Sequence, residues 1–203
     1  GGEPSVGGQS GSGGNAGSGG DAPSGPVLPV DAAHVRLLPG SPLYDRQELH
    51  RQGLLASLDP DRLLYEYRRL ANLPQPSGVT GGYAGWDTGF IKGHMSGHYL
   101  SAASRMAAAT GDASFATKVN YLVDELAKCQ AALGSEGYLA AFPEAVFDWV
   151  EGSNVDNGGI VVPYYTVQKI LSGLLDAHHY LGNQPALEAA TKLADYFRAR
   201  LAA

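Results

Sequence analysis

The chain has 203 residues and a formal net charge of −6, with 14 Lys and Arg against 20 Asp and Glu. This length suits one domain with a substantial core, and an acidic chain without a basic stripe is not expected to bind nucleic acid. No apolar run approaches the roughly 20 residues that span a bilayer. The single cysteine, Cys129, excludes an intrachain disulfide and a zinc site made from clustered cysteines of this chain.

Residues 1–25 hold eleven of the 28 glycines and no aromatic residue, Lys or Arg. Such a segment cannot bury enough apolar surface to offset its ordering entropy, so it is predicted to be a disordered Gly/Ser tether before a domain at 26–203. The tether fits a mature exported protein, secreted or anchored to the cell envelope as a lipoprotein, whose signal has been removed. An artificial linker would have the same composition.

The rest of the chain reads as helices separated by glycine and proline. Asp59-Pro60, Asp112 and Asn183 are N-cap signals, and Gly53 is expected to interrupt the first helix. A glycine-rich loop covers 74–89, and 134–162 is a long excursion. Helices are expected over 43–58, 60–71, 90–109, 113–133, 143–150, 163–180 and from 184 onwards. Because period-two alternation is absent, the predicted fold class is all-α.

An internal repeat appears when the chain is shifted by 71 residues. The shift places 110–112 (TGD) on 181–183 (LGN), the same turn followed by a capped helix. Each copy is a small-residue, nearly apolar helix followed by an amphipathic one, which indicates an inner helix paired with an outer one. Repeated pairs of this kind predict an (α/α)6 toroid whose inner helices point one end into a central cleft.

Polar residues recur at that end of the two inner helices. Under the repeat, His94 corresponds to Tyr165 and His98 to Lys169. His94 and His98, four residues apart, share a helix face, but a zinc peptidase would need His-Glu-x-x-His and no third ligand is evident. Neutral imidazoles that bind sugar hydroxyls are the preferred interpretation, and satisfied core histidines are the alternative.

Trp86 and Asp87 follow the glycine-rich loop. An indole can stack on a sugar and a carboxylate can accept two hydroxyl hydrogen bonds; alternatively, Trp86 anchors the loop on the core and Asp87 or Thr88 caps the next helix. Glu144 and Asp148 lie among aromatic residues and resemble a glycosidase carboxylate pair, although helical pairs of acids are commonplace. Cys129 falls within a helical pattern and is expected to be buried rather than nucleophilic.

Three stretches carry a resemblance to a known family: 81–112 (GGYAGWDTGFIKGHMSGHYLSAASRMAAATGD), 121–144 (YLVDELAKCQAALGSEGYLAAFPE) and 162–197 (VPYYTVQKILSGLLDAHHYLGNQPALEAATKLADYF). Together they resemble the N-terminal part of β-L-arabinofuranosidase-type glycoside hydrolases, family 127 and its relative 146. The resemblance covers about 36–203. It implies an (α/α)6 barrel and retaining hydrolysis of terminal arabinofuranose, with a zinc-held cysteine nucleophile and a glutamate acid/base.

Two departures qualify this resemblance. The family's zinc-bound cysteines and catalytic glutamate lie further along the barrel, and Cys129 does not match the nucleophile's motif. The chain therefore resembles about the first half of the catalytic barrel, zinc is expected only in the complete enzyme, and the isolated chain is expected to be inactive. Many relatives also have histidine where this chain has Gln168. By resemblance, the sugar pocket would be lined by Trp86, Asp87, His94, His98, Tyr165, Gln168 and Lys169.

Glu144 is retained as a further substrate-binding candidate, and none of these residues would be the nucleophile. Two alternatives stay open: a non-catalytic carbohydrate-binding or truncated barrel protein, and an α/α-toroid lyase or epimerase that acts on uronic sugars. The expected ligand is an oligosaccharide or glycan. Because half a toroid would expose apolar faces of its inner helices, the missing half of the barrel or self-association is expected to cover them.

Overall fold

The computed structural model describes residues 30–134 and 136–202, and within these ranges it is all-α with no strand. The expected tether at 1–25 lies outside the described residues. Short 3₁₀ segments occupy Ala32–His34 and Gly85–Asp87. The α-helices are α1 (Pro42–Leu49), α2 (Leu55–Ser57), α3 (Pro60–Leu70), α4 (His94–Thr110), α5 (Ala113–Leu133), α6 (Ala145–Val150), α7 (Pro163–Leu181) and α8 (Gln184–Leu201).

The expected helix caps are confirmed. The carboxylate of Asp59 accepts from the Asp61 N–H at 2.9 Å at the start of α3, and Asp112 accepts from Ser114 N–H at 3.1 Å at the start of α5. Asn183 accepts from Ala186 N–H at 2.8 Å at the start of α8. The α4–α5 and α7–α8 turns each use a left-handed glycine followed by a capping side chain, as the repeat predicts.

One boundary agrees with expectation and one differs. The first α-helix is interrupted around Gly53, as expected, by a π-helical turn (His50–Leu54) that separates α1 from α2. The fourth helix begins at His94 rather than Phe90. Gly93 has a φ of +83°, and a Cβ there would lie 2.5 Å from Ala141 Cβ. The left-handed glycine forces a turn at 90–93 before the helix can start.

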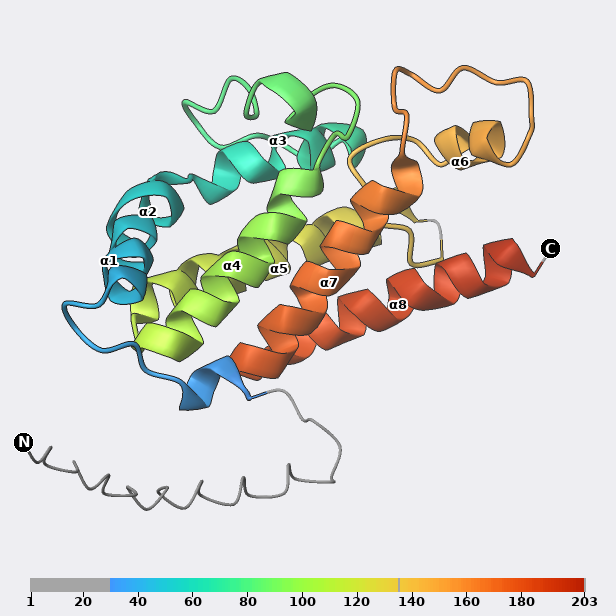
Figure 1. Ribbon diagram of the computed structural model, residues 1–203. Helices are drawn as coiled ribbons and strands as arrows, with labels where there is room; N and C mark the ends of the chain where they lie inside the picture. Colours follow the sequence, from blue (N-terminus) through green and yellow to red (C-terminus); the bar gives the residue numbers. More distant parts are fainter. Residues whose placement is uncertain (1–29, 135, 203) are drawn as a thin grey trace, which may run out of the picture.

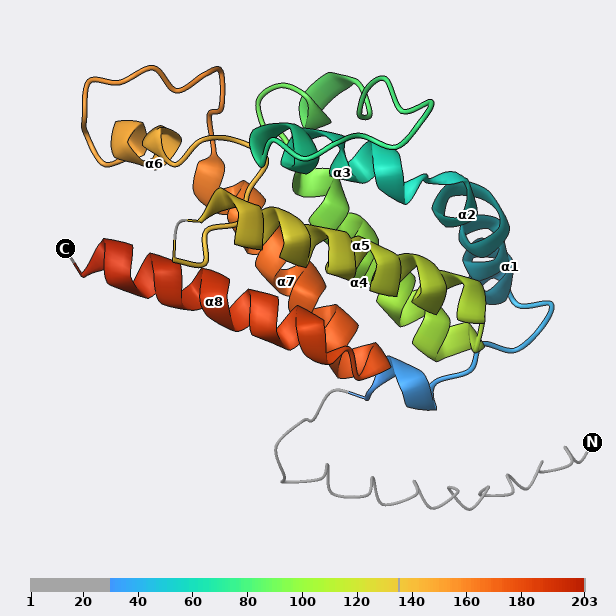
Figure 2. The ribbon, with the colours of Figure 1, turned by 180° about the vertical axis from the view of Figure 1, so that it is seen from behind.

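The long helices form two layers. Figures 1 and 2 show α4 and α7 side by side in one layer, with α5 and α8 in the other. The core between the layers consists of fully buried aliphatic side chains from all four helices, among them Leu100, Val119, Leu122, Leu126, Ile170, Leu174 and Leu193. The first helices of the two repeated hairpins therefore share one layer, and the second helices share the other.

The inner helices α4 and α7 touch through their backbones. A Cβ on Gly97 would lie 2.2 Å from the carbonyl carbon and oxygen of Lys169, and a Cβ on Gly173 would lie 2.5 Å from the carbonyl oxygen of Gly97. Only hydrogen fits at either position. The two helices run parallel, so their N-terminal ends lie at the same end of the molecule (Figure 1).

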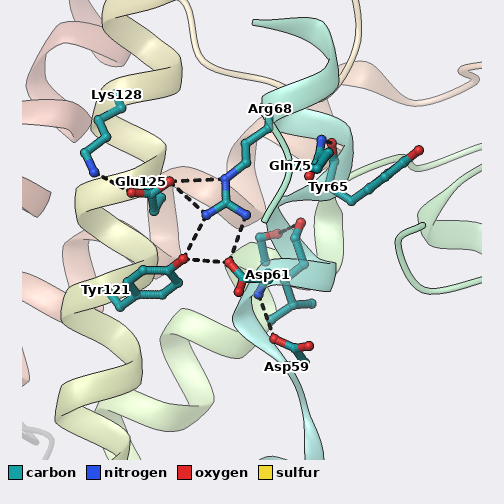
Figure 3. Close-up of polar contacts among 10 residues, drawn as sticks. Asp59, Asp61, Tyr65, Arg68, Gln75, Tyr121, Glu125 and Lys128 are labelled. Atoms are coloured by element: carbon teal, nitrogen blue, oxygen red, sulfur yellow. Dashed lines mark hydrogen bonds and ion pairs between the residues drawn. The ribbon is translucent and has the colours of Figure 1, made fainter. Parts of the chain in front are cut away.

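A buried arginine joins α3 to α5. Arg68 is only 2% exposed, and Figure 3 shows its guanidinium between Asp61, Tyr121 and Glu125. It donates to Asp61 Oδ1 and Glu125 Oε2 at 2.8 Å each and to the Tyr121 hydroxyl at 3.0 Å. These hydrogen bonds replace the ones that the guanidinium would make to water if it were exposed. The network therefore holds α3 against α5 of the outer layer.

The inner helices do not expose the apolar face that the sequence predicts. In the described ranges, α4 exposes no large hydrophobic side chain and α7 exposes only Tyr165 and Leu175. The open face of this layer is polar, and the ion pair between Arg105 and Asp176 spans it at 3.0 Å. Exposed large apolar side chains gather instead on the segment before α3 and on the segment from α6 to α7: Val35, Leu38, Leu43, Leu49, Leu54, Trp149, Val150, Val155, Val161 and Val162.

Across 30–134 and 136–202, every helix is too short or too polar to cross a bilayer.

Gly97→Ala should lower the free energy of unfolding by about 3 kcal/mol, because its methyl group would force the α4 and α7 backbones apart. Gly53→Ala is the control, since a Cβ at that helical glycine meets nothing within 4 Å and should change stability by less than about 1 kcal/mol. Urea unfolding measures both. Equal midpoints for the two variants would contradict the backbone contact.

Candidate functional site

The parallel packing of α4 and α7 brings four of the predicted residues together. The His94 and His98 rings lie 5.5 Å apart edge to face, and the His94 ring lies 6.4 Å from that of Tyr165. Lys169 Nζ lies 4.7 Å from the centre of the Tyr165 ring. We call these residues, His94, His98, Tyr165 and Lys169, the α4–α7 cluster. The repeat had placed the same residues at equivalent positions.

His94 is buried at the first turn of α4. Its Nδ1 lies 2.8 Å from the Ile91 carbonyl oxygen and 3.3 Å from Asp87 Oδ1. A carbonyl can only accept, so Nδ1 carries the hydrogen, and in the neutral ring Nε2 is left as an acceptor. This bond fixes the tautomer and orientation of the imidazole.

His98 is exposed one turn further along, and its Nε2 lies 3.4 Å from the Tyr165 hydroxyl. Partial burial lowers the pKa of His98 below its usual 6.5, and the nearby His94 and Lys169 lower it further. His98 is therefore neutral at pH 7, with one donor and one acceptor nitrogen. That pair of functions suits a hydroxyl group, which both donates and accepts.

Asp87 has a structural task. It is 5% exposed, its Oδ1 accepts from the Met95 N–H at 3.0 Å, and its carbonyl oxygen accepts from Gly93 N–H. Burial raises the pKa of its carboxyl group, while the bond from Met95 acts in the opposite direction. The alternative that Asp87 caps the next helix is thus realised across the turn at 90–93. A sugar hydroxyl would have to share this carboxylate with the helix.

Trp86 is 70% exposed. The alternative that this tryptophan anchors its loop on the core is therefore wrong. Its indole is accessible for stacking on a ligand.

The side chains of the remaining candidates have their polar partners outside the cluster. Gln168 is exposed on α7 and donates to Ser172 Oγ at 3.0 Å. Glu144, just before α6, accepts from the Tyr196 hydroxyl of α8 at 2.6 Å, and both line a separate cavity of about 550 Å³. Asp148 forms an ion pair with Arg200 of α8. The Glu144 and Asp148 carboxylates therefore face the outer helix, where each already has a partner.

No group of three or more His, Cys, Asp or Glu within the described ranges could hold a metal ion. Cys129 is fully buried in α5, and burial raises the pKa of its thiol to about 11. The residues within the described ranges therefore do not fit the zinc centre that the resemblance implies.

The glycines that position the site were not among the residues predicted from the sequence. Gly97 and Gly173 allow the α4–α7 contact, and Gly93 creates the turn that Asp87 stabilises. Small residues within otherwise apolar inner helices were visible in the sequence. Their partners were not, because the Gly97–Gly173 pair does not follow the 71-residue register.

The fold and site together define an all-α protein of paired helical hairpins in which α4 and α7 present a cluster of polar side chains at one end. Comparison with family models gives a match over residues 34–203 to the family described as "Beta-L-arabinofuranosidase, GH127 catalytic domain". The chain belongs to this family of glycoside hydrolases. A comparison with curated proteins found no match.

Asp87→Ala should lower the free energy of unfolding by about 1–2 kcal/mol, because the Met95 N–H loses its acceptor at the start of α4. Asp87→Asn keeps an oxygen acceptor and should cost clearly less. Thermal unfolding of the two variants at pH 7 provides the comparison. If both variants melt like the parent, Asp87 does not stabilise the helix start.

Lys169→Met should raise the pKa of His98 towards 6.5, because it removes a like charge that opposes protonation. In the parent, His98 has a lower pKa in the folded chain than in the unfolded chain. The neutral His98 ring therefore adds to the free energy of unfolding above pH 6.5, and this contribution is lost as the pH falls below 6.5. NMR titration of the His98 ring measures the pKa. Lys192→Met on α8 is the control and should leave it unchanged.

Proposed function

We propose that this chain forms the sugar-binding wall of a glycoside hydrolase that removes terminal arabinofuranose from glycans. The family match over 34–203 carries the proposal, and the α4–α7 cluster supports it independently. In this proposal the two layers belong to an (α/α)6 toroid, with α4 and α7 as inner helices. Extracellular glycans would suit the export predicted from residues 1–25.

The cluster offers a furanose ring complementary partners. His94 contributes an acceptor nitrogen in a fixed orientation, and His98 contributes one donor and one acceptor. Lys169 supplies donors only, held over the Tyr165 ring by a cation–π contact. Trp86 is available to stack on an apolar sugar face. Gln168, one turn beyond Tyr165, is assigned to the edge of the sugar.

The chain's own part in this function is binding rather than bond cleavage. A cysteine nucleophile acts as its thiolate, and the buried Cys129 thiol with its raised pKa cannot reach a sugar from inside α5. Asp87 is occupied with the helix start and Glu144 with Tyr196, so neither is placed as a free acid or base at the cluster. The same observations support the alternative of a carbohydrate-binding protein without chemistry of its own.

The uronic-sugar alternative depends on Lys169. In the described ranges Arg105 is paired with Asp176 and Lys92 with Glu66, whereas Lys169 forms no ion pair and would be available to a carboxylate. A uronate that binds the chain more tightly than an arabinofuranoside would favour this alternative.

Calorimetric titration with methyl β-L-arabinofuranoside tests the proposal. We expect saturable binding, weakened about tenfold in His98→Ala because a hydroxyl loses its donor–acceptor partner. His50→Ala, an exposed histidine before α2, is the control and should bind like the parent. We also expect the chain alone not to hydrolyse an aryl arabinofuranoside. Absence of binding, or rapid hydrolysis by this chain, would contradict the proposal.

A further inference from the structure

The first turn of α4 carries His94, and it begins at a residue that cannot cap it. Gly93 occupies the N-cap position with a φ of +83° and has no side chain to accept from the helix N–H groups. The turn at 90–93 therefore depends on other segments to hold it in place. Asp87 provides one attachment, because its carboxylate accepts from the Met95 N–H. Helix α3 provides another.

Two hydrogen bonds join α3 to the first turn of α4. The Tyr67 hydroxyl donates to the Gly93 carbonyl oxygen at 2.9 Å. One turn earlier on the same face of α3, the Leu63 carbonyl oxygen accepts from Ser96 Oγ at 3.0 Å. Gly93 precedes His94 in the chain and Ser96 follows it, so the two bonds flank the histidine. Figures 1 and 2 show α3 beside the beginning of α4.

Both bonds lie in the core, out of reach of a ligand. Tyr67 and Ser96 are fully buried, and Leu63 is almost so. A Cβ on Gly93 would lie 2.9 Å from the Tyr67 hydroxyl oxygen, so the phenol packs directly against this backbone. Burial raises the pKa of the Tyr67 hydroxyl well above its usual 10, so the group keeps its proton and remains a donor. Tyr67 can therefore act on the backbone next to His94 but cannot contact a sugar.

Helix α3 is itself anchored to the outer layer by the residue that follows Tyr67. Arg68 forms ion pairs at 2.8 Å with Asp61 of α3 and with Glu125 of α5. Because neighbouring residues on a helix point in different directions, Arg68 reaches α5 while Tyr67 reaches the start of α4. Helix α3 therefore connects the outer layer to the turn that carries His94.

The orientation of the His94 ring depends on this turn. Its Nδ1 lies 2.8 Å from the carbonyl oxygen of Ile91, so a displaced turn would weaken this bond and the preference for hydrogen on Nδ1. We infer that Tyr67 and Ser96 are positioning residues, whose bonds to α4 and α3 hold the turn so that His94 keeps its hydrogen on Nδ1 and its acceptor on Nε2. The effect on sugar affinity rests on the proposed function, whereas the effect on the imidazole needs no ligand.

Nitrogen NMR of the His94 ring tests the inference without a ligand, because a ring nitrogen that carries hydrogen has a distinct chemical shift. We expect the unmodified chain to hold the hydrogen on Nδ1. Tyr67→Phe removes only a hydroxyl and should raise the share of rings with hydrogen on Nε2. Ser96→Ala removes the other bond and should change the ring in the same direction, so the test does not depend on one variant.

Gln130→Met is the control for a general loss of stability. The Gln130 amide is buried and donates to the carbonyl oxygens of Gly137 and Ala189, at 2.7 and 3.1 Å, outside α3 and α4. The variant loses both hydrogen bonds and should be less stable than the unmodified chain in thermal unfolding. Its His94 ring should nevertheless keep the nitrogen shifts of the unmodified chain.

Titration with methyl β-L-arabinofuranoside adds a functional measurement. Tyr67→Phe should weaken binding about fivefold, since part of the molecules lose the acceptor on Nε2 of His94. Gln130→Met should bind like the unmodified chain. In a His94→Ala background, Tyr67→Phe should cause no further loss, because a residue that acts through His94 then has nothing to position.

The inference is overturned if the His94 ring keeps its nitrogen shifts in both Tyr67→Phe and Ser96→Ala, or if Gln130→Met changes them equally. It is also overturned if Tyr67→Phe weakens binding to the same extent with and without His94, because Tyr67 would then support only the fold. If the unmodified chain does not bind the glycoside, the proposed function fails, and the ring spectra alone decide whether Tyr67 and Ser96 position His94.

Discussion

The direct backbone contact between α4 and α7 is the constraint on which the rest of this structure depends. Gly97 and Gly173 leave no room for a Cβ, so the two helices lie closer than side chains would permit. Because the helices are parallel, this contact sets both their separation and their register. It places the first turn of α4 beside the first turn of α7, and the four cluster residues meet there.

The surrounding structure holds this pair of helices in position. The outer helices α5 and α8 cover the inner pair with a continuous aliphatic core, and the buried Arg68 network locks α3 onto α5. On the other side, Gly93 and Asp87 define where α4 begins. His94 follows at once, with its ring fixed by the Ile91 carbonyl. The geometry of the cluster is thus a consequence of packing and capping.

The open face of the layer formed by α4 and α7 is polar, whereas the sequence predicts an apolar one. An apolar inner face would have made the layer itself an association surface, but its open side carries histidines, the Arg105–Asp176 ion pair and few large apolar groups. Such a face agrees with the sugar-binding role proposed for it. Most of the exposed apolar side chains lie before α3 and from α6 to the start of α7, and Trp86 and Phe90 lie in the segment before α4.

The sequence by itself determined the all-α class, the repeated hairpin, the caps at Asp59, Asp112 and Asn183, and the recurrence of polar residues at the same end of the two helices, His94 and His98 in one and Tyr165 and Lys169 in the other. These features depend on local periodicity and on residues close in the chain. Tertiary structure alone decided that Asp87 is engaged by a helix start, that Glu144 faces α8, and that Tyr67 of α3 bonds to the turn before His94. Each of these depends on contacts between distant segments, and helical periodicity carries no information about which residue from another element will fill the space opposite a side chain.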